Sequence, residues 1–409
     1  MSKIKNITGR QIKDSRGKPT IEVELETEKG VFIASVPSGA STGENEALEL
    51  RDIDGRGVFK AIENINRIIA PQVKGKNPEN QKEIDELMIA LDGTENKSKL
   101  GANAILGVSM VVCRAGAGAK KFPLYHHIAE LAGFKIQDSR FKIPLPMFNI
   151  LEGGKHVHLQ THLDVQEFII VPQKKTFAEN LVVCNRVFQR LKDLIEKNYG
   201  FAGLGDEGGF ALAVPKTEQA LYLLKSAGTD EGVKIALDCA ASQFYKEGKY
   251  QLEGREMTKT ELLEFYTSLI NNFPIISIED PFSEEDWQGF ELITRHLGEK
   301  IIIIGDDLTT TNIGRIKEAH NKSACNGVIL KLNQIGTVSE TIEASILAKS
   351  FGWKTIVSHR SGETMDDFIT DLAVGLGADF LKAGSPAKPE RMVKYNRLLE
   401  IEKELKKQR

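Results

Sequence analysis

Polar side chains close six short apolar segments in the second half of the chain, and their types could do chemistry together. The spacings between successive members are 41, 27, 25, 28 and 23 residues, and each matches one strand–helix unit. In a (β/α)8 barrel the carboxyl ends of the strands face one mouth, so we expect these side chains to converge on one pocket. A single charged strand end is often merely solvated, but six of six argue against that interpretation. The residues are Asp238, Glu279, Asp306, Lys331, His359 and Lys382.

The three acids in this set suggest a metal site. Asp238, Glu279 and Asp306 offer only hard oxygen ligands, which favour Mg²⁺ or Mn²⁺ over zinc. A lysine held beside such an ion would have a lowered pKa and could act as a general base, a role open to Lys331. The run from His359 to Gly362 combines a guanidinium, a hydroxyl and flexible backbone, which suits a phosphate or carboxylate clamp.

A glycine-framed acidic segment adds a candidate general acid. Gly203 to Gly209 reads GLGDEGG, and its glycines match GxGxxG. No strand precedes the segment and its two carboxylates would repel a pyrophosphate, so we reject a nucleotide loop. Glu207 is better interpreted as a positioned general acid, with a solvated turn as the alternative. A second segment, EGGKH from Glu152, leads to Gln166 and Glu167 at the start of an apolar strand.

The elements that must position these groups differ between the two parts of the chain. The first part predicts an α+β unit, with a hairpin over 20–26 and 31–36, a mobile small-residue loop from Ser38 to Gly43, and helices over 58–69, 80–90 and 102–119. The periodicity lapses around 133–139. We therefore predict two domains, an N-terminal α+β capping domain at 1–135 and a catalytic barrel domain at 136–409.

Seven continuous apolar runs in the second part predict buried parallel strands, with amphipathic helices at 260–271 and 337–351 between them. Roughly 270 residues of such units fit a (β/α)8 barrel of about 250 residues. An open doubly wound sheet is the rival architecture. The predicted strands are 168–171, 233–237, 275–278, 301–304, 328–330, 355–357 and 380–381.

Composition narrows the class of protein. Of the 409 residues, 54 are Lys or Arg and 57 are Asp or Glu, and a net charge of −3 argues against a nucleic-acid or anionic-membrane partner. The four cysteines are far apart, which predicts reduced thiols rather than a disulfide framework or zinc ribbon. No apolar signal-peptide core begins the sequence and no window approaches 18 uninterrupted apolar residues, so we expect a soluble cytoplasmic protein.

Twelve segments that cover nearly the whole chain resemble the enolase family, in family order. The resemblance implies an N-terminal α+β domain followed by an enolase-type (β/α)8 barrel. The segments are DSRGKPTIEVE from Asp14, VPSGASTGE from Val36, ALELRD from Ala47, QEF from Gln166, GDEGG from Gly205, ALDCAASQFY from Ala236, SIEDP from Ser277, GDDLTTTN from Gly305, LKLNQIGT from Leu330, SHRSGET from Ser358, DLAVGLGA from Asp371 and KYNRLLEIE from Lys394.

The resemblance also implies an activity, the reversible, Mg²⁺-dependent dehydration of 2-phospho-D-glycerate to phosphoenolpyruvate in glycolysis and gluconeogenesis. Lys331 matches the base that removes the C2 proton, and Glu207 matches the acid that helps the hydroxyl leave, with Glu167 beside it. Two Mg²⁺ ions are implied per active site, one on Asp238, Glu279 and Asp306, and a second that arrives with substrate as Ser41 closes over it. The implied substrate contacts are Gln166, His156, Lys331, His359, Lys382 for the carboxylate, and Arg360 and Ser361 for the phosphate.

The resemblance implies a homodimer or an octamer of dimers, with Arg16 as a candidate interface residue, and it is compatible with additional display at the cell surface. The chain departs from the family pattern at Glu152 and Gln243, and in about two extra residues that include His158 and His162. Two rivals are an acid-sugar dehydratase or racemase of the same superfamily and a structural protein without the chemistry. The SHRSG segment argues against the first, and the retained acids and lysine argue against the second.

Overall fold

The structure is a computed structural model, and it describes residues 2–40, 43–53, 55–134, 141–157, 163–200 and 203–407. The boundary predicted at residue 135 lies outside the described residues, because 135–140 are not among them. The same holds for Ser41, His158 and His162. The two-domain division therefore stays a prediction.

The N-terminal part begins with a three-stranded antiparallel sheet in the order β1 (Ile4–Lys13), β2 (Pro19–Thr27) and β3 (Gly30–Ser35). The predicted hairpin is β2–β3 and is confirmed. Strand β1 was not predicted. In β1 and β2, buried residues alternate with less buried ones, as expected for strands with one face on a core.

Helix α4 (Ala102–Lys120) packs on that sheet, and two glycines let it approach closely. A Cβ atom at Gly107 would lie 2.6 Å from Val23 Cγ2, and one at Gly118 would lie 2.4 Å from Phe32 Cζ. This close approach accounts for the small residues in the helix. By length and composition α4 could also cross a membrane, but 83% of its apolar window is buried within the protein.

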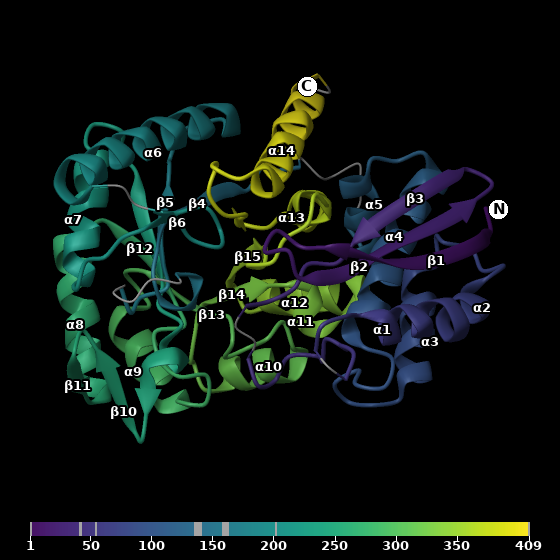
Figure 1. Cartoon of the computed structure of the whole chain (residues 1–409), viewed down its shortest axis with the longest axis horizontal. Helices are drawn as coiled ribbons and strands as arrows, with labels where there is room; N and C mark the ends of the chain where they lie inside the picture. The colour runs from purple at the N-terminus through teal and green to yellow at the C-terminus, as the bar shows by residue number, and fades with distance from the viewer. Residues whose placement is uncertain are drawn as a thin grey trace.

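Two further N-terminal helices lie close to their predicted positions. A continuous helical segment, predicted over 58–69, runs through α1 (Phe59–Asn64), a π-helical turn (Ile65–Ile69) and α2 (Ala70–Val73). It is followed by α3 (Gln81–Asp92), predicted over 80–90. Helix α5 (Leu124–Leu131), which follows α4, was not predicted. In Figure 1 these helices and the first sheet form the purple-to-blue side of the molecule.

Eight strands close into a barrel, which confirms the predicted fold class. Neighbours pair in the order given below, and the last strand pairs with the first. The strands are β4 (Leu145–Glu152), β5 (Glu167–Val171), β8 (Lys234–Asp238), β12 (Ile275–Glu279), β13 (Ile302–Gly305), β14 (Gly327–Leu330), β15 (Lys354–Ser358) and β16 (Phe380–Lys382).

Strand β5 runs antiparallel to both of its neighbours, β4 and β8, so the prediction of a parallel strand at 168–171 was wrong. An apolar run shows that a strand is buried on both faces but does not show its direction. The reversal has a functional consequence. Because β5 begins where β8 ends, Glu167 pairs with Asp238 at the carboxyl mouth of the barrel.

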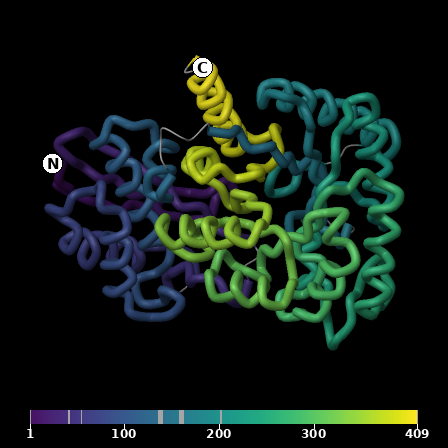
Figure 2. The backbone as a smooth tube through the Cα atoms, turned by 180° about the vertical axis from the view of Figure 1, so that it is seen from behind, coloured from purple at the N-terminus to yellow at the C-terminus, as the bar shows by residue number. Residues whose placement is uncertain are grey.

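Helices cover the outside of the barrel, and the N-terminal part packs against its late elements. Figures 1 and 2 both show it beside the chain that follows β14, where α3, α4 and α5 contact α11, α12 and α13. Short strands outside the barrel are β6 (Gly203–Leu204), β7 (Phe210–Ala211), β9 (Tyr245–Lys246), β10 (Lys249–Leu252) and β11 (Arg255–Met257). The barrel helices are α6 (Phe177–Tyr199), α7 (Thr217–Ala227), α8 (Lys259–Asn272), α9 (Trp287–Leu297), α10 (Ile313–Asn321), α11 (Leu332–Ile335), α12 (Val338–Ser350), α13 (Phe368–Leu376) and α14 (Pro389–Lys407).

The barrel interior is filled by one apolar cluster contributed by seven of the eight strands. Its members are Met147, Ile169, Val171, Ala236, Ile304, Ile329, Ile356 and Phe380, all buried. Since successive strand residues point to opposite faces, the residue two positions along a strand points to the same interior. That rule locates the site.

Candidate active site

The candidate active site lies where the inward-facing rows of the barrel end. Ala236 is followed two residues later by Asp238, Ile304 by Asp306, Ile329 by Lys331, and Phe380 by Lys382. These polar residues all line one cavity. The remaining predicted residues that line it are His156, Gln166, Glu167, Glu207, His359, Arg360 and Ser361. Glu279 ends β12 beside them and contacts Lys382.

Lys382 lies at the centre of three carboxylates. Its Nζ is 3.1 Å from Glu167 Oε2, 3.1 Å from Asp238 Oδ2 and 2.8 Å from Glu279 Oε2, and all four side chains are buried. Burial by itself would lower the pKa of Lys382, but Asp238 and then the two glutamates raise it well above the ordinary lysine value. The ammonium therefore stays charged and neutralises part of the carboxylate cluster.

Lys331 forms a hydrogen-bonded ion pair with Asp306, whose other oxygen accepts a 2.9 Å hydrogen bond from Gln334 Nε2. Burial would lower the pKa of Lys331, but the negative charge of Asp306 raises it above the ordinary value. The expectation of a lowered pKa for Lys331 rested on a nearby divalent ion. The protein side chains alone have the opposite effect.

Acidic side chains at the mouth could hold a metal ion. Asp280, Asp306 and Asp307 bring carboxylate oxygens within 4.8 Å of one another. Of the predicted metal ligands, only Asp306 belongs to a group this tight among the described residues. Asp238 and Glu279 both contact Lys382. Burial raises the pKa of Glu279, and the nearby Asp238 raises it further. The oxygen-only donor set fits a hard divalent cation.

Sequence reasoning missed Asp280 and Asp307. Burial and then acidic neighbours raise the pKa of both well above the ordinary value, and Asp280 accepts the backbone N–H groups of Asp306 (2.9 Å) and Asp307 (2.7 Å). Each directly follows a predicted ligand in the sequence, as Glu279–Asp280 and Asp306–Asp307. That doubling of acids was the available signal.

The second side of the cavity carries Glu207 and two histidines. Glu207 Oε2 is 3.0 Å from His359 Nε2 and accepts a 3.1 Å hydrogen bond from Asn149 Nδ2. Arg391 Nη1 donates to His359 Nδ1 at 2.6 Å, which leaves the Nε2 proton of a neutral imidazole facing Glu207. Burial lowers the pKa of His359 to about 4. His156 Nε2 lies 3.8 Å from Glu207 Oε1.

Neighbouring groups and burial shift the pKa values of Glu207 and Glu167 in opposite directions. Burial would raise the pKa of Glu207, but His359, His156 and Arg391 hold it below its ordinary value. Burial raises the pKa of Glu167, and Glu207 raises it further. The pair therefore presents one carboxyl that keeps a proton and one carboxylate that does not, an arrangement suited to acid–base work.

The predicted phosphate clamp is engaged by a residue that sequence reasoning missed. Arg360 makes a two-pronged ion pair with Glu46, at 2.9 Å and 3.2 Å, and its Nη1 also donates to Asn333 Oδ1 at 3.0 Å. Ser361 Oγ lies 3.1 Å from His156 Nε2. Glu46 stands 314 residues before Arg360, so no local pattern could pair them. An incoming phosphate would share or replace this carboxylate.

Gln166 bonds both to a predicted metal ligand, Asp238, and to Gln243, which departs from the family pattern. Its Nε2 donates to Asp238 Oδ2 at 3.4 Å, and its Oε1 accepts a hydrogen bond from Gln243 Nε2. Gln243 Oε1 also accepts the backbone N–H of Lys155 at 3.1 Å. Gln243 thus fixes the side chain of a predicted substrate contact.

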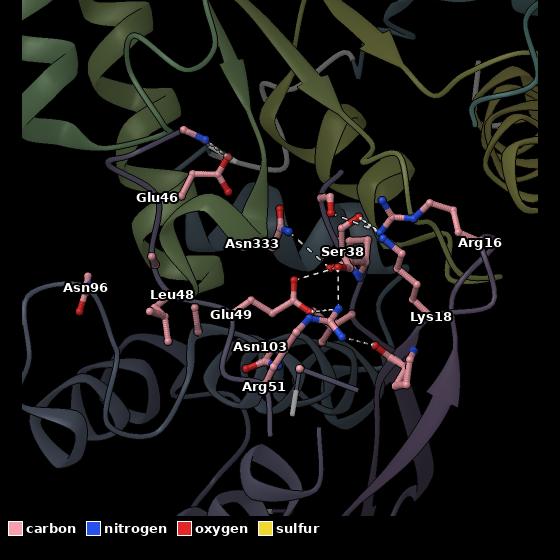
Figure 3. A pocket seen from close by; sticks show the side chains of 18 of the residues that line it. Arg16, Lys18, Ser38, Glu46, Leu48, Glu49, Arg51, Asn96, Asn103 and Asn333 are labelled. Carbon is pink, nitrogen blue, oxygen red and sulfur yellow. Dashed lines mark hydrogen bonds and ion pairs between the residues drawn. The ribbon is translucent and has the colours of Figure 1, made fainter. Parts of the chain in front are cut away.

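A second hollow, of about 820 Å³, lies beside the predicted mobile loop rather than at the barrel mouth (Figure 3). There Ser38 Oγ donates to Glu49 at 2.8 Å and accepts from Arg51 at 3.1 Å. Arg16 bonds to Asp14 at 2.9 Å and to the Ser38 carbonyl at 3.2 Å. Ser38 also pairs through its backbone with Gly362, so the start of this loop is tied to the clamp segment. Arg16 serves contacts within the chain.

Comparisons with known proteins cover almost the whole chain. A family model described as "Enolase, C-terminal TIM barrel domain" matches residues 140–409, and one described as "Enolase, N-terminal domain" matches residues 4–128. "Enolase" of Elusimicrobium minutum (strain Pei191) is 48% identical over 416 residues, covering 100% of this chain and 97% of that protein. "Enolase B" of Dictyostelium discoideum is 48% identical over 428 residues, covering 99% of this chain and 95% of that protein.

Proposed function

The chain belongs to the enolase family, and from that premise we propose how its own residues perform the reaction. It is a hydro-lyase of glycolysis that acts on a small-molecule substrate, interconverting 2-phospho-D-glycerate and phosphoenolpyruvate. The observation that carries the residue assignment is that Lys331 and Glu207 line the same buried cavity. The reaction needs one base and one acid, and this pair supplies them.

Lys331 removes the proton from C2 of the substrate. The electron pair of that C–H bond moves toward the neighbouring carboxylate, which is already negatively charged. The proton is therefore only weakly acidic unless the added charge is stabilised. Because Asp306 keeps Lys331 protonated, Lys331 accepts a proton only once the charge of Asp306 is neutralised. Asp238, Glu279 and Asp306 would hold Mg²⁺, with Ser41 at a second ion that arrives with substrate, and the bound ions supply Lewis-acid stabilisation of the substrate carboxylate.

Glu207 then delivers a proton to the hydroxyl on C3. In the free site that proton is held by Glu167, whose pKa is raised by burial and by Glu207 and whose carboxyl lies within 4.8 Å of that of Glu207. The C3–O bond breaks, water leaves, and the electron pair from C2 completes the double bond. In the hydration direction Glu207 receives the proton back from water.

The remaining residues bind and orient the substrate. Arg360 and Ser361 hold the phosphate, and Lys382 contacts the carboxylate from among its three acidic neighbours. Gln166, His156 and His359 complete the contacts, since each lines the cavity. Burial of every one of these groups strengthens their interactions with a charged ligand.

We further propose that the chain functions in the cytoplasm, with domains at 1–135 and 136–409, and that it assembles as a homodimer or an octamer of dimers. Arg16 stays the candidate interface residue: its Nη2 contacts Asp14 and Ser38, whereas its Nη1 has no hydrogen-bond partner among the described residues. Light scattering of the purified protein distinguishes a monomer, a dimer and a larger assembly.

The proposed function is tested by following phosphoenolpyruvate formation by ultraviolet absorbance. The wild-type protein is measured with Mg²⁺ and with chelator, beside Lys331→Ala and the exposed-surface variant Lys317→Ala as a matched control. We expect turnover that requires Mg²⁺, an Lys317→Ala variant equal to wild type, and a loss of about 10³-fold in Lys331→Ala. Absence of turnover in folded, Mg²⁺-loaded wild-type protein would overturn the assignment.

A further inference from the structure

Glu152 is a buried carboxyl that belongs to none of the roles above. It ends β4, has no exposed surface, and points both of its oxygens at the turn that carries Glu207. Oε2 accepts the backbone N–H of Glu207 at 3.2 Å, and Oε1 accepts that of Gly209 at 2.5 Å. Both bonds are made to main-chain groups, so the side chain of Glu207 is left free to face the cavity.

The turn is built around this carboxyl. A Cβ atom at Gly205 would lie 2.2 Å from Glu152 Oε2, and one at Gly209 would lie 3.0 Å from Oε1. Glycine at these two positions lets the backbone come within hydrogen-bonding reach of the carboxyl. The fit shows that Glu152 and the Gly205–Gly209 turn act as one packed unit.

Burial raises the pKa of the Glu152 carboxyl to about 8, and Glu207 is the largest charged contributor to that rise. At neutral pH Glu152 therefore carries a proton and adds no negative charge beside Glu207. What Glu152 supplies to the general acid is the position of its backbone.

Other charged groups also lie close to Glu152 and Glu207. His156 Nδ1 is 3.9 Å from Glu152 Oε2 and 3.7 Å from Glu167 Oε1. Lys388 Nζ donates to the carbonyls of Gly205 at 2.9 Å and Asp206 at 3.0 Å. The full set around Glu152 and Glu207 is His156, Glu167, Asp206, His359, Lys382, Lys388 and Arg391.

From these contacts we propose that Glu152 is a positioning residue for the general acid: its two oxygens fix the backbone turn that holds the Glu207 carboxyl in the cavity. The proposal rests on the proposed function, in which Glu207 donates the proton. The family pattern has Asn at this position, and an amide could fill the role only in part, because it has one oxygen to accept with.

The test compares Glu152→Gln and Glu152→Asp with wild type in steady-state kinetics over a range of pH. In Glu152→Gln we expect kcat to fall roughly tenfold, a part of the 10²–10⁴ that general acid catalysis contributes, with KM within about twofold of wild type. Glu152→Asp keeps both acceptor oxygens, one methylene further from the turn, and should lose less of kcat than Glu152→Gln.

Asp85→Asn is the matched control. Asp85 is also fully buried, has a pKa raised by burial and accepts a backbone N–H, that of Ser339 at 3.0 Å, but it lies where α3 meets α12. We expect lower stability with an unchanged kcat per folded molecule. If Glu152→Gln behaves like Asp85→Asn, losing stability while it keeps wild-type kcat, the proposal is overturned. Wild-type protein without turnover would instead overturn the proposed function.

Discussion

The barrel interior has two halves: a lower half lined by apolar side chains, and an upper half, at the carboxyl mouth, lined by polar ones. In both halves the side chains point inward from alternate residues of the same strands. In the lower half the inward rows carry Ile304, Ile329, Ile356 and Phe380, which pack into one apolar cluster. Two residues further along their strands the rows end in Asp306, Lys331, Ser358 and Lys382. The lower half buries apolar surface and stabilises the fold, whereas the upper half buries charges at a cost.

The difference teaches where stability and chemistry reside in this molecule. Removing an apolar side chain below should cost stability and spare the chemistry of folded molecules. Removing one of the crowded acids above should cost chemistry and spare stability, because the mouth is not optimised for the fold. Lys382 is the exception, because it neutralises three buried carboxylates. Substitutions in the two halves can therefore test the comparison directly.

The largest effect is expected at Glu207. In Glu207→Gln the shape of the side chain is kept but the proton to be donated is lost, so kcat should fall about 10³-fold. The free energy of unfolding in urea should not decrease. Glu264→Gln, on the exposed face of α8, is the matched control and should match wild type in both measurements. A Glu207→Gln variant that unfolds at much lower urea concentration would contradict the claim that the upper half serves chemistry rather than stability.

Lys382 should have the largest effect on stability at the mouth. Lys382→Met leaves Glu167, Asp238 and Glu279 without their shared cation, and we expect a loss of about 4 kcal/mol in urea unfolding without metal. The loss should shrink when Mg²⁺ is added, since a bound cation compensates the same carboxylates. An equal loss with and without Mg²⁺ would show that these acids do not share a metal site with the lysine.

Ile329 tests the lower half. Ile329→Ala removes a fully buried side chain from the apolar cluster and should lower the free energy of unfolding by about 3 kcal/mol. The kcat per folded molecule should stay within about twofold of wild type, in contrast to Lys331→Ala two residues later on the same strand. Comparable losses of kcat in both variants would contradict the comparison.

The smallest effect concerns a buried histidine far from the mouth. Burial in α5 lowers the pKa of His127 to about 4 from an ordinary 6.5, so the unfolded chain binds this proton first. Stability should therefore fall as the pH drops through 6.5 toward 4, by about 1 kcal/mol between pH 7 and pH 5.5. His127→Gln should flatten that part of the stability profile in thermal unfolding. A profile of unchanged slope would assign the acid sensitivity to the mouth instead.

Much of the barrel could be predicted because each strand carries its own evidence. The run before Asp238 or Lys331 marks a buried strand, and the polar residue that ends it marks the mouth. The direction of β5 could not be predicted, since the apolar run FIIV is compatible with either a parallel or an antiparallel strand. The pairing of Glu46 with Arg360 and the raised pKa of Lys331 depend on neighbours far away in the chain. Local patterns do not encode such partners.

The pairing of β4 with β16, which closes the barrel, can form only late in the synthesis of the chain. Strand β4 pairs with β5 at once through a local antiparallel ladder, but its other edge waits for β16. From residue 145 to residue 380, at 5–20 residues per second, that wait lasts roughly 10 to 50 s on the ribosome. Throughout it, the edge beside Leu145–Met147 offers unpaired backbone to other nascent chains. Shielding of that edge until the last strand emerges would therefore reduce aggregation of the new chain.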